Sequence, residues 1–270
     1  MTNNVAAVGL EAFLRSGRDE GRKLLAPYVT GGLRDDWTEL LGAMVNAGAD
    51  AVEVGLPFSD PMMDGPTIQE ASFLALERGT TPVSVLGELR ELDVSVPLVV
   101  MTYTNLVVRA GTKRFASELA AAGVSGAIVP DLPLEESLEW EHDAASVGVE
   151  TVLLAAPVTP PERLAEICKR SHGFVYGVNV MGVTGERQSL ASSSGLLAKR
   201  LKAATDKPIL MGFGISGPEQ AVAAAQEADG VVVGAALMRA AIEGASPEEV
   251  GERVGAIRSA LDAAYRPLGG

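Results

Sequence analysis

The sequence predicts an α/β protein, a single eight-stranded (β/α)8 barrel of the TIM type, on three observations. The length of 270 residues is usual for one such barrel. Short runs rich in β-branched and apolar residues alternate along the chain with amphipathic, alanine-rich stretches. No Gly/Ser-rich or Pro-rich linker divides the chain. Together they favour one large α/β domain over residues 1–270.

Eight segments have the apolar composition of strands that are buried in a parallel sheet. We expect these strands over residues 23–30, 50–57, 97–104, 126–131, 150–157, 174–179, 208–215 and 230–237. Helical patterns fill the gaps between them, over residues 36–46, 113–122, 134–147, 161–171, 196–204, 219–226 and 247–265. An extra helix over 10–18 precedes the first strand, and helices over 67–77 and 82–92 lie between the second and third strands.

An open, doubly wound sheet is the alternative architecture. That fold usually carries a glycine-rich phosphate fingerprint after its first strand, and the segment from Thr30 to Leu33 does not fit it. Residues 266–270, with a proline and two glycines, predict a frayed tail.

Composition excludes several classes of function. A formal net charge of -13, without a basic stripe, makes nucleic acid an unsuitable partner. The single cysteine, Cys168, excludes an intramolecular disulfide, and we expect it to pack in the core. No window approaches the ~20 apolar residues of a membrane span, and the N-terminal segment is unlike a signal peptide. We therefore expect a cytoplasmic protein.

Glu53 is the first candidate for chemistry. In the segment 50–57 a period of two places Val52, Val54 and Leu56 on one face, and Glu53 on the other between Ala51 and Gly55. A carboxyl group inside a barrel needs a cation or a task that uses a raised pKa, because burying its charge costs several kcal/mol. The alternative is a structural Glu satisfied by backbone or water. The position predicts a general acid/base.

The loop after this strand carries Asp60 and Asp64 between prolines that restrict its backbone. These aspartates are either functional groups on a positioned loop or ordinary turn and N-cap residues. The composition of the loop leaves both interpretations open.

Glycines at the ends of the last two strands predict a phosphate site. Gly212, Phe213 and Gly214 lie toward the end of the predicted seventh strand, and Gly234 and Ala235 lie toward the end of the eighth, before a helix. Backbone N–H groups and a helix N-terminus can hold a phosphate without Lys or Arg. Simple turns are the alternative. The long polar segment 180–195 after the sixth strand predicts a mobile lid, with disorder without function as the alternative.

Other kinds of catalysis lack the residues they need. His142 and His172 are the only histidines, and both fall away from the predicted catalytic rim. The sequence has no serine elbow, Walker loop, dinucleotide fingerprint or histidine-containing metal constellation. Acid/base catalysis is therefore favoured over hydrolysis by a nucleophile, metal chemistry and redox chemistry.

Two motifs in the Glu53–Asp64 region carry a family resemblance. The segments 53–61 (EVGLPFSDP) and 64–69 (DGPTIQ) resemble the signature of tryptophan synthase alpha subunits. Further similar segments are 130–137 (PDLPLEES), 182–185 (GVTG) and 212–216 (GFGIS), so the resemblance spans nearly the whole chain. It implies a carbon–carbon lyase, without a cofactor or metal, that cleaves indole-3-glycerol phosphate to indole and glyceraldehyde 3-phosphate in tryptophan biosynthesis.

The resemblance also implies roles for individual residues. Glu53 matches the acid/base, and Asp64 matches the carboxylate that assists at the indole nitrogen. The residues that would border the indole are Tyr28, Met101, Ile128, Leu154 and Tyr176. Thr184 would bond Asp64 when the lid closes, and Gly185, Gly214 and Gly234 would hold the phosphate. Further substrate-binding positions are Gly212, Phe213 and Ala235. The implied partner is a pyridoxal-phosphate beta subunit in an α2β2 heterotetramer, with Pro57 and Asp60 as interface positions.

Three departures from the family pattern affect these expectations. Ala235 stands where the family commonly has a serine, so one hydroxyl donor to the phosphate is lost. Tyr28 replaces a common Phe at the indole wall, and the segment 179–181 before Gly182 differs from the usual forms. Alternative functions are a stand-alone lyase that releases free indole, a non-catalytic effector subunit, and another sugar-phosphate barrel such as an isomerase. Retention of both Glu53 and Asp64 disfavours the effector.

Overall fold

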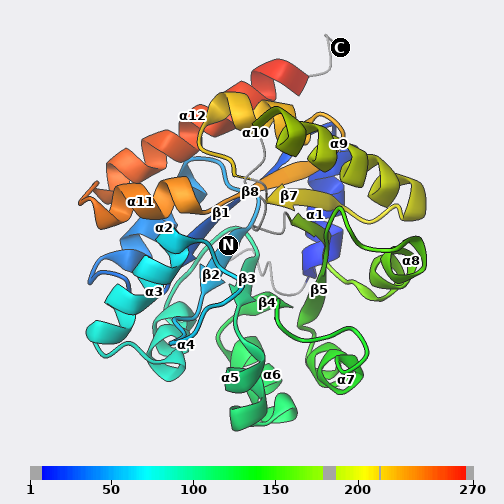
Figure 1. Cartoon of the computed structure of the whole chain (residues 1–270). Helices are drawn as coiled ribbons and strands as arrows, with labels where there is room; N and C mark the ends of the chain where they lie inside the picture. The colour runs from blue at the N-terminus through cyan, green and yellow to red at the C-terminus, as the bar shows by residue number, and fades with distance from the viewer. Residues whose placement is uncertain (1–7, 179–186, 213, 266–270) are drawn as a thin grey trace.

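Eight parallel strands close into a barrel in the order β1 to β8, with β8 pairing back to β1 (Figure 1). The computed structural model describes residues 8–178, 187–212 and 214–265. The strands are β1 (Leu24–Thr30), β2 (Val52–Gly55), β3 (Leu98–Met101), β4 (Val124–Ile128), β5 (Glu150–Ala155), β6 (Val175–Val178), β7 (Ile209–Gly212) and β8 (Gly230–Val233). The predicted fold class is confirmed.

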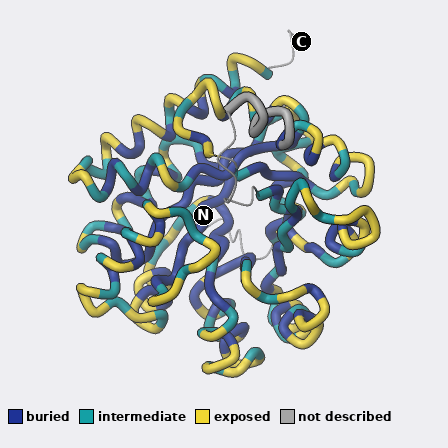
Figure 2. The backbone as a smooth tube through the Cα atoms, viewed as in Figure 1, coloured by how far each residue is buried: buried dark blue, intermediate teal, exposed yellow. Residues whose placement is uncertain are grey.

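Helices surround the barrel and, apart from α1, lie on the outer side of its strands (Figure 1). They are α1 (Leu10–Asp19), α2 (Trp37–Asn46), α3 (Pro66–Glu77), α4 (Pro82–Arg90), α5 (Thr104–Ala110), α6 (Thr112–Ala121), α7 (Leu138–Ser146), α8 (Pro161–Arg170), α9 (Arg187–Ala204), α10 (Pro218–Ala225), α11 (Ala235–Ile242) and α12 (Pro247–Tyr265). The expected extra helices are present as α1, α3 and α4. Figure 2 shows buried residues along the barrel strands and exposed residues on the outer sides of the helices.

Strand side chains alternate between two hydrophobic cores, as a period of two requires. Val52, Val54 and Leu56 belong to the outer core between the barrel and the helices. Ala51, Val99 and Ile128 belong to the inner core, which fills the barrel. Cys168 lies on α8 and is buried in a third cluster, to which α8, α9 and strands β5 to β7 contribute residues. Its expected packing role is confirmed. The interior is thus packed rather than hollow.

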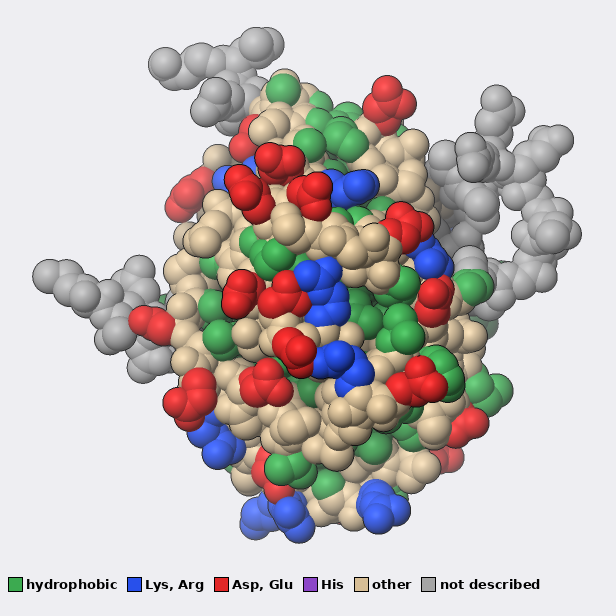
Figure 3. Space-filling view, turned by 90° about the vertical axis from the view of Figure 1, so that its left-hand side faces the viewer, with side chains coloured by type: hydrophobic (Ala, Val, Ile, Leu, Met, Phe, Trp, Pro, Cys, Tyr) green, Lys and Arg blue, Asp and Glu red, His purple; other side chains and the backbone are tan. Residues whose placement is uncertain are grey.

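Charged side chains of both signs are interspersed on the face shown in Figure 3. Arg239 of α11 pairs with Glu70 of α3, so this ion pair joins the two helices. His142 and His172 are both exposed, as expected. Among the helices of the described segments, none is long and apolar enough to cross a membrane.

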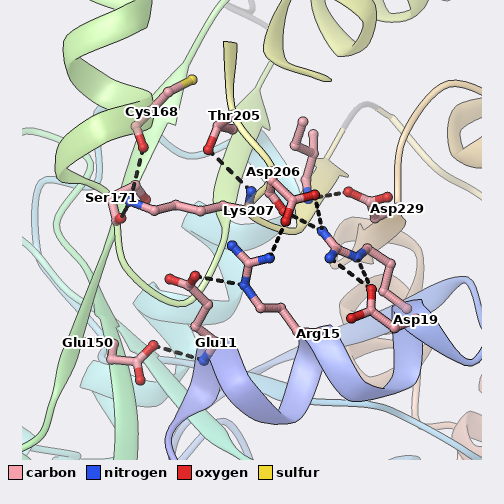
Figure 4. Close-up of polar contacts among 12 residues, drawn as sticks. Glu11, Arg15, Asp19, Glu150, Cys168, Ser171, Thr205, Asp206, Lys207 and Asp229 are labelled. Atoms are coloured by element: carbon pink, nitrogen blue, oxygen red, sulfur yellow. Dashed lines mark hydrogen bonds and ion pairs between the residues drawn. The ribbon is translucent and has the colours of Figure 1, made fainter. Parts of the chain in front are cut away.

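Helix α1 closes one end of the barrel. Leu10 and Leu14 on its inner face have no exposed surface and join the inner core. The Glu150 carboxylate, at the start of β5, accepts the backbone N–H of Glu11 at 2.8 Å (Figure 4). Arg15 on the same helix bonds Asp206 in the loop before β7 at 2.7 Å. Apolar packing and polar contacts therefore hold α1 against the strands.

Several predicted element boundaries were wrong. The eighth strand ends at Val233, four residues before the predicted end, because the Ala-rich run from Ala235 forms α11 and buries Leu237 and Met238 against the outer core. Residues 187–195, predicted as part of a loop, belong to α9. Helix α5 was not predicted, and α7 starts at Leu138 rather than at residue 134. The expected tail over 266–270 lies outside the described residues.

Candidate active site

Glu53 lies on β2 and faces the barrel interior, as the alternation predicted. Its Cα is in register with Tyr28 on β1 and with Val99 on β3, an inner-core residue. The side chain is buried, and within the described part of the chain Oε2 has no hydrogen-bond partner. Burial, and then the charge of Asp64, raise the pKa of Glu53 to about 8. Backbone or water was the structural alternative for this carboxyl group, and among the described residues no backbone group bonds Oε2.

Asp64 lies at the end of the loop that joins β2 to α3. The N-cap of α3 is Gly65, so interpreting Asp64 as a helix cap was wrong. Its Oδ2 instead accepts a hydrogen bond from the Tyr103 hydroxyl at 2.9 Å. Burial raises the pKa of Asp64 to about 6, against the lowering effect of that hydrogen bond. The structure thus brings together two carboxyl groups with raised pKa values, and Asp64 is close enough that its charge raises the pKa of Glu53.

Tyr28 covers one side of this site. A Cβ placed on Gly55 would lie 1.9 Å from the Tyr28 hydroxyl oxygen, so only glycine leaves room for the ring on the next strand. The buried Thr30 hydroxyl donates to the Tyr28 oxygen at 3.2 Å. Burial raises the pKa of Tyr28, and the nearby charge of Asp64 raises it further. Tyr28 therefore presents a neutral phenol to the two carboxyl groups.

Apolar side chains form the remaining wall. Ile128 is fully buried in the inner core, and Met101, Leu154 and Tyr176 pack against that core while staying partly exposed. The Tyr176 ring fills the space over Gly212, where a Cβ would lie 2.5 Å from the ring. All five predicted indole-wall residues, including Tyr28, thus lie on the inner face of the barrel strands.

The predicted phosphate end of the site lies at β7, β8 and α11. Gly214 has a φ of 44°, in the left-handed region that favours glycine, and a Cβ there would meet no atom of the described residues within 4 Å. Gly234 is the N-cap of α11, and the exposed Ala235 is the first residue of that helix. The first N–H groups of a helix lack intrahelical acceptors and attract anions. The backbone here suits a phosphate group.

Other predicted site residues differ in what the structure says of them. Thr184, Gly185 and Phe213 lie outside the described residues. Asp60 is exposed and accepts a hydrogen bond from the Ser59 hydroxyl, whereas Pro57 is buried. Tyr103, which bonds Asp64, was missed by the sequence analysis. Its place two residues after Met101, on the inward-facing period of β3, is the signal that indicates it.

The chain was compared with known proteins. A family model described as tryptophan synthase alpha chain matches residues 14–265. The chain belongs to the tryptophan synthase alpha chain family. Among curated members, the chain is 43% identical over 257 residues to the tryptophan synthase alpha chain of Halorhodospira halophila, and the match covers 92% of this chain and 94% of the relative. It is 46% identical over 231 residues to the tryptophan synthase alpha chain of Gloeobacter violaceus, and the match covers 84% of both chains.

Solved structures agree with this membership. A chain from Mycobacterium tuberculosis tryptophan synthase superposes with a TM-score of 0.84 and 38% identity, covering 93% of this chain and 97% of that one. The Legionella pneumophila tryptophan synthase subunit alpha also superposes with a TM-score of 0.84 and 32% identity, covering 94% of this chain and 98% of that one. As a tryptophan synthase alpha chain family member, the protein is a lyase (EC 4.2.1.20) of tryptophan biosynthesis.

Proposed function

We propose that the chain cleaves indole-3-glycerol phosphate to indole and glyceraldehyde 3-phosphate, with Glu53 as the acid/base and Asp64 as the acceptor of the indole N–H. The observation that carries this proposal is the pair of inward-facing carboxyl groups, electrostatically coupled and bordered by apolar side chains. A flat, apolar ring with one N–H donor complements such a space.

The two carboxyl groups suit different proton-transfer roles. Glu53, with a pKa of about 8, holds its proton near neutral pH, and Asp64, with a pKa of about 6, is mostly ionised there. Glu53 donates its proton to indole C3, and the carbon–carbon bond to the glycerol chain breaks. The substrate hydroxyl gives its proton to Glu53 as the aldehyde forms. Asp64, accepting the indole N–H, stabilises the positive charge that develops on the ring.

The phosphate of the substrate is assigned to the backbone at the other end of the site. Open space above Gly214 and the N-terminus of α11 after Gly234 support this assignment. From the family pattern, Gly185, Phe213 and Ala235 join this end, and Thr184 bonds Asp64 when the site closes. Exclusion of water on closure then strengthens the electrostatic interactions with the substrate.

The proposed partner is a tryptophan synthase beta subunit in an α2β2 complex in the cytoplasm. The exposed Asp60, on the same loop as Asp64, is the candidate contact, with the buried Pro57 shaping that loop. A partner bound there would hold the Asp64 loop closed. A stand-alone lyase, in contrast, would turn over at full rate without a beta subunit.

Indole release from indole-3-glycerol phosphate, measured with and without a beta subunit, tests the proposed reaction. We expect Glu53→Gln to lower kcat by roughly 100-fold or more, because proton transfer by a positioned group contributes on that scale. Asp64→Asn should also lower kcat, while Glu219→Gln, an exposed change on α10, should leave it unaltered. Unchanged turnover in Glu53→Gln would refute the assigned role. High turnover without a beta subunit would identify the stand-alone lyase.

A further inference from the structure

Tyr103 contacts the Asp64 loop at both of its ends. Its hydroxyl donates to Asp64 Oδ2 at 2.9 Å and accepts the backbone N–H of Met63 at 3.2 Å. Its ring stacks on Phe58, at the start of the same loop, with centroids 4.8 Å apart and an interplanar angle of 19°. A single buried side chain at the end of β3 therefore touches residues 58, 63 and 64.

The backbone beside Tyr103 is itself fixed by the next strand of the barrel. Tyr103 is the N-cap residue of α5. The following residue, Thr104, donates its backbone N–H and its hydroxyl to Asp131 Oδ1, at 2.9 and 3.0 Å. Asp131 lies just beyond the end of β4. The Asp64 loop is thus connected through Tyr103 to β3 and β4, rather than only to its own strand.

The hydrogen bonds fix the direction in which the Tyr103 proton points. Because the phenol oxygen accepts the Met63 N–H, the hydroxyl proton is available for Asp64, and each bond polarises the other. The bond uses Oδ2, and among the described residues no group donates to Oδ1, which can accept an N–H from a ring in the site. A hydrogen bond from a neutral donor stabilises the charged form of a carboxyl group.

We propose that Tyr103 is a positioning residue for the lyase reaction, holding Asp64 ionised and turned toward the substrate before the substrate binds. This inference rests on the proposed role of Asp64 at the indole nitrogen. It adds a residue that acts through Asp64 rather than on the reacting atoms. Stacking on Phe58 orders the loop, and the hydroxyl orients the carboxylate.

Tyr103→Phe tests the hydroxyl alone, because the ring that stacks on Phe58 is kept. We expect kcat for indole release to fall roughly 10-fold with little change in KM, since the charge that Asp64 stabilises develops in the transition state. Tyr265→Phe is the matched control. That hydroxyl donates to the Val222 carbonyl oxygen at 2.7 Å, beside α10 and away from the site. The control should keep the wild-type kcat.

The pH profile of kcat/KM gives a readout that a merely structural role would not move. Loss of the Tyr103 hydrogen bond raises the pKa of Asp64, so a smaller fraction is ionised at a given pH. The acid limb in Tyr103→Phe should therefore move to higher pH. Three other titratable groups interact with Asp64, Glu53 on β2 and the phenols of Tyr28 and Tyr176, and all three stay in place in this variant.

Hydrogen exchange of the loop provides a measurement independent of activity. In Tyr103→Phe the Met63 amide loses its acceptor, so the peptide covering residues 58–65 should exchange faster, and peptides from α12 should not change. The same peptide should keep its wild-type exchange in Tyr265→Phe.

A double-mutant cycle decides whether Tyr103 acts through Asp64. In an Asp64→Asn background, Tyr103→Phe should cost less than twofold in kcat. An equal fall in both backgrounds, or an unmoved pH profile and unchanged exchange in Tyr103→Phe, would overturn the inference. If the wild-type chain released no indole, the proposed function itself would fail, and the exchange result would still report whether Tyr103 holds the loop.

Discussion

Glu53 is held where its charged form is unfavourable. It lies between Ala51 and Gly55 inside the barrel, and its pKa is raised by burial and by the charge of Asp64. A residue selected for stability alone would not place a carboxyl group there, since buried charge without a partner destabilises the folded state. The same environment gives Glu53 a proton to donate near neutral pH. Stability and function therefore conflict at this residue.

The conflict predicts a pH-dependent gain in stability from Glu53→Gln. A raised folded-state pKa means that the native protein binds more protons than the unfolded chain between the ordinary pKa of 4.5 and about 8. The wild-type free energy of unfolding therefore falls as pH rises through this window, by at most about 1.4 kcal/mol per pH unit. Urea unfolding should show Glu53→Gln close to wild type at pH 5 and more stable at pH 8. Parallel pH profiles for the two proteins would contradict this expectation.

Ala235 allows the proposed phosphate site to be strengthened. It is exposed at the first position of α11, so Ala235→Ser adds a hydroxyl donor without a clash. We expect KM for indole-3-glycerol phosphate to fall roughly 3- to 10-fold, the range of one hydrogen bond that contributes about 0.5 to 1.5 kcal/mol. Ala236→Ser, one residue further along and turned around the helix axis, is the control. Equal effects from both substitutions would remove the assignment of Ala235 to the phosphate.

At the next level, elements are joined by a buried ionic cluster at the start of β2. Asp50 Oδ2 accepts the Leu25 N–H at 2.8 Å and bonds Arg258 of α12 at 3.1 Å, while Oδ1 bonds Arg22 at 2.6 Å. Arg258 also donates to the Lys23 carbonyl oxygen and pairs with Asp262. The cluster ties the last helix to the first two strands.

Arg258→Ala should therefore destabilise the fold. Removing the guanidinium group leaves the buried negative charge of Asp50 with one cationic partner fewer. Breaking a buried ion pair costs about 3 to 5 kcal/mol. The free energy of unfolding in urea measures the loss. Arg253→Ala is an exposed change of the same type on the same helix and should have little effect. Similar losses in the two variants would show that Arg258 acts only through its place in α12.

For the molecule as a whole, closure of the barrel depends on α1 as well as on the strands. Leu10 fits beside two glycines, Gly126 and Gly173, where an added Cβ would lie 2.5 Å from the Leu10 side chain. Leu14 joins it in the inner core. The helix thus packs against the end of the barrel interior opposite Glu53 and Asp64, and it shields the inner core from solvent.

Truncation of this contact should weaken the whole fold. We expect Leu10→Ala to lower the free energy of unfolding by about 2 to 5 kcal/mol, because a fully buried leucine leaves a cavity that the strands cannot fill. Val8→Ala, at a side chain that is 57% exposed just before α1, is the control. The free energies of unfolding of the two variants, measured by thermal or urea unfolding, should differ clearly, with Leu10→Ala the less stable. A small loss in Leu10→Ala would mean that the bottom of the barrel is closed without this side chain.

Much of the fold and part of the site follow from local sequence. Alternation of strand and helix patterns determines the barrel class, and a period of two places Glu53 inside and Val52, Val54 and Leu56 outside. Boundaries were less certain where composition suits two structures. The run after Gly234 has apolar residues compatible with a strand, and it forms α11 because Leu237 and Met238 bury against the outer core as helical residues.

The sequence by itself determined the fold class, the inward orientation of Glu53 and, through its motifs, the family. Tertiary structure alone decided that Tyr103 bonds Asp64 and that Arg258 meets Asp50, 208 positions away. Periodicity specifies which face a side chain occupies, because it depends only on local backbone geometry. Which groups meet across the barrel depends on strand register and closure, which no local pattern contains.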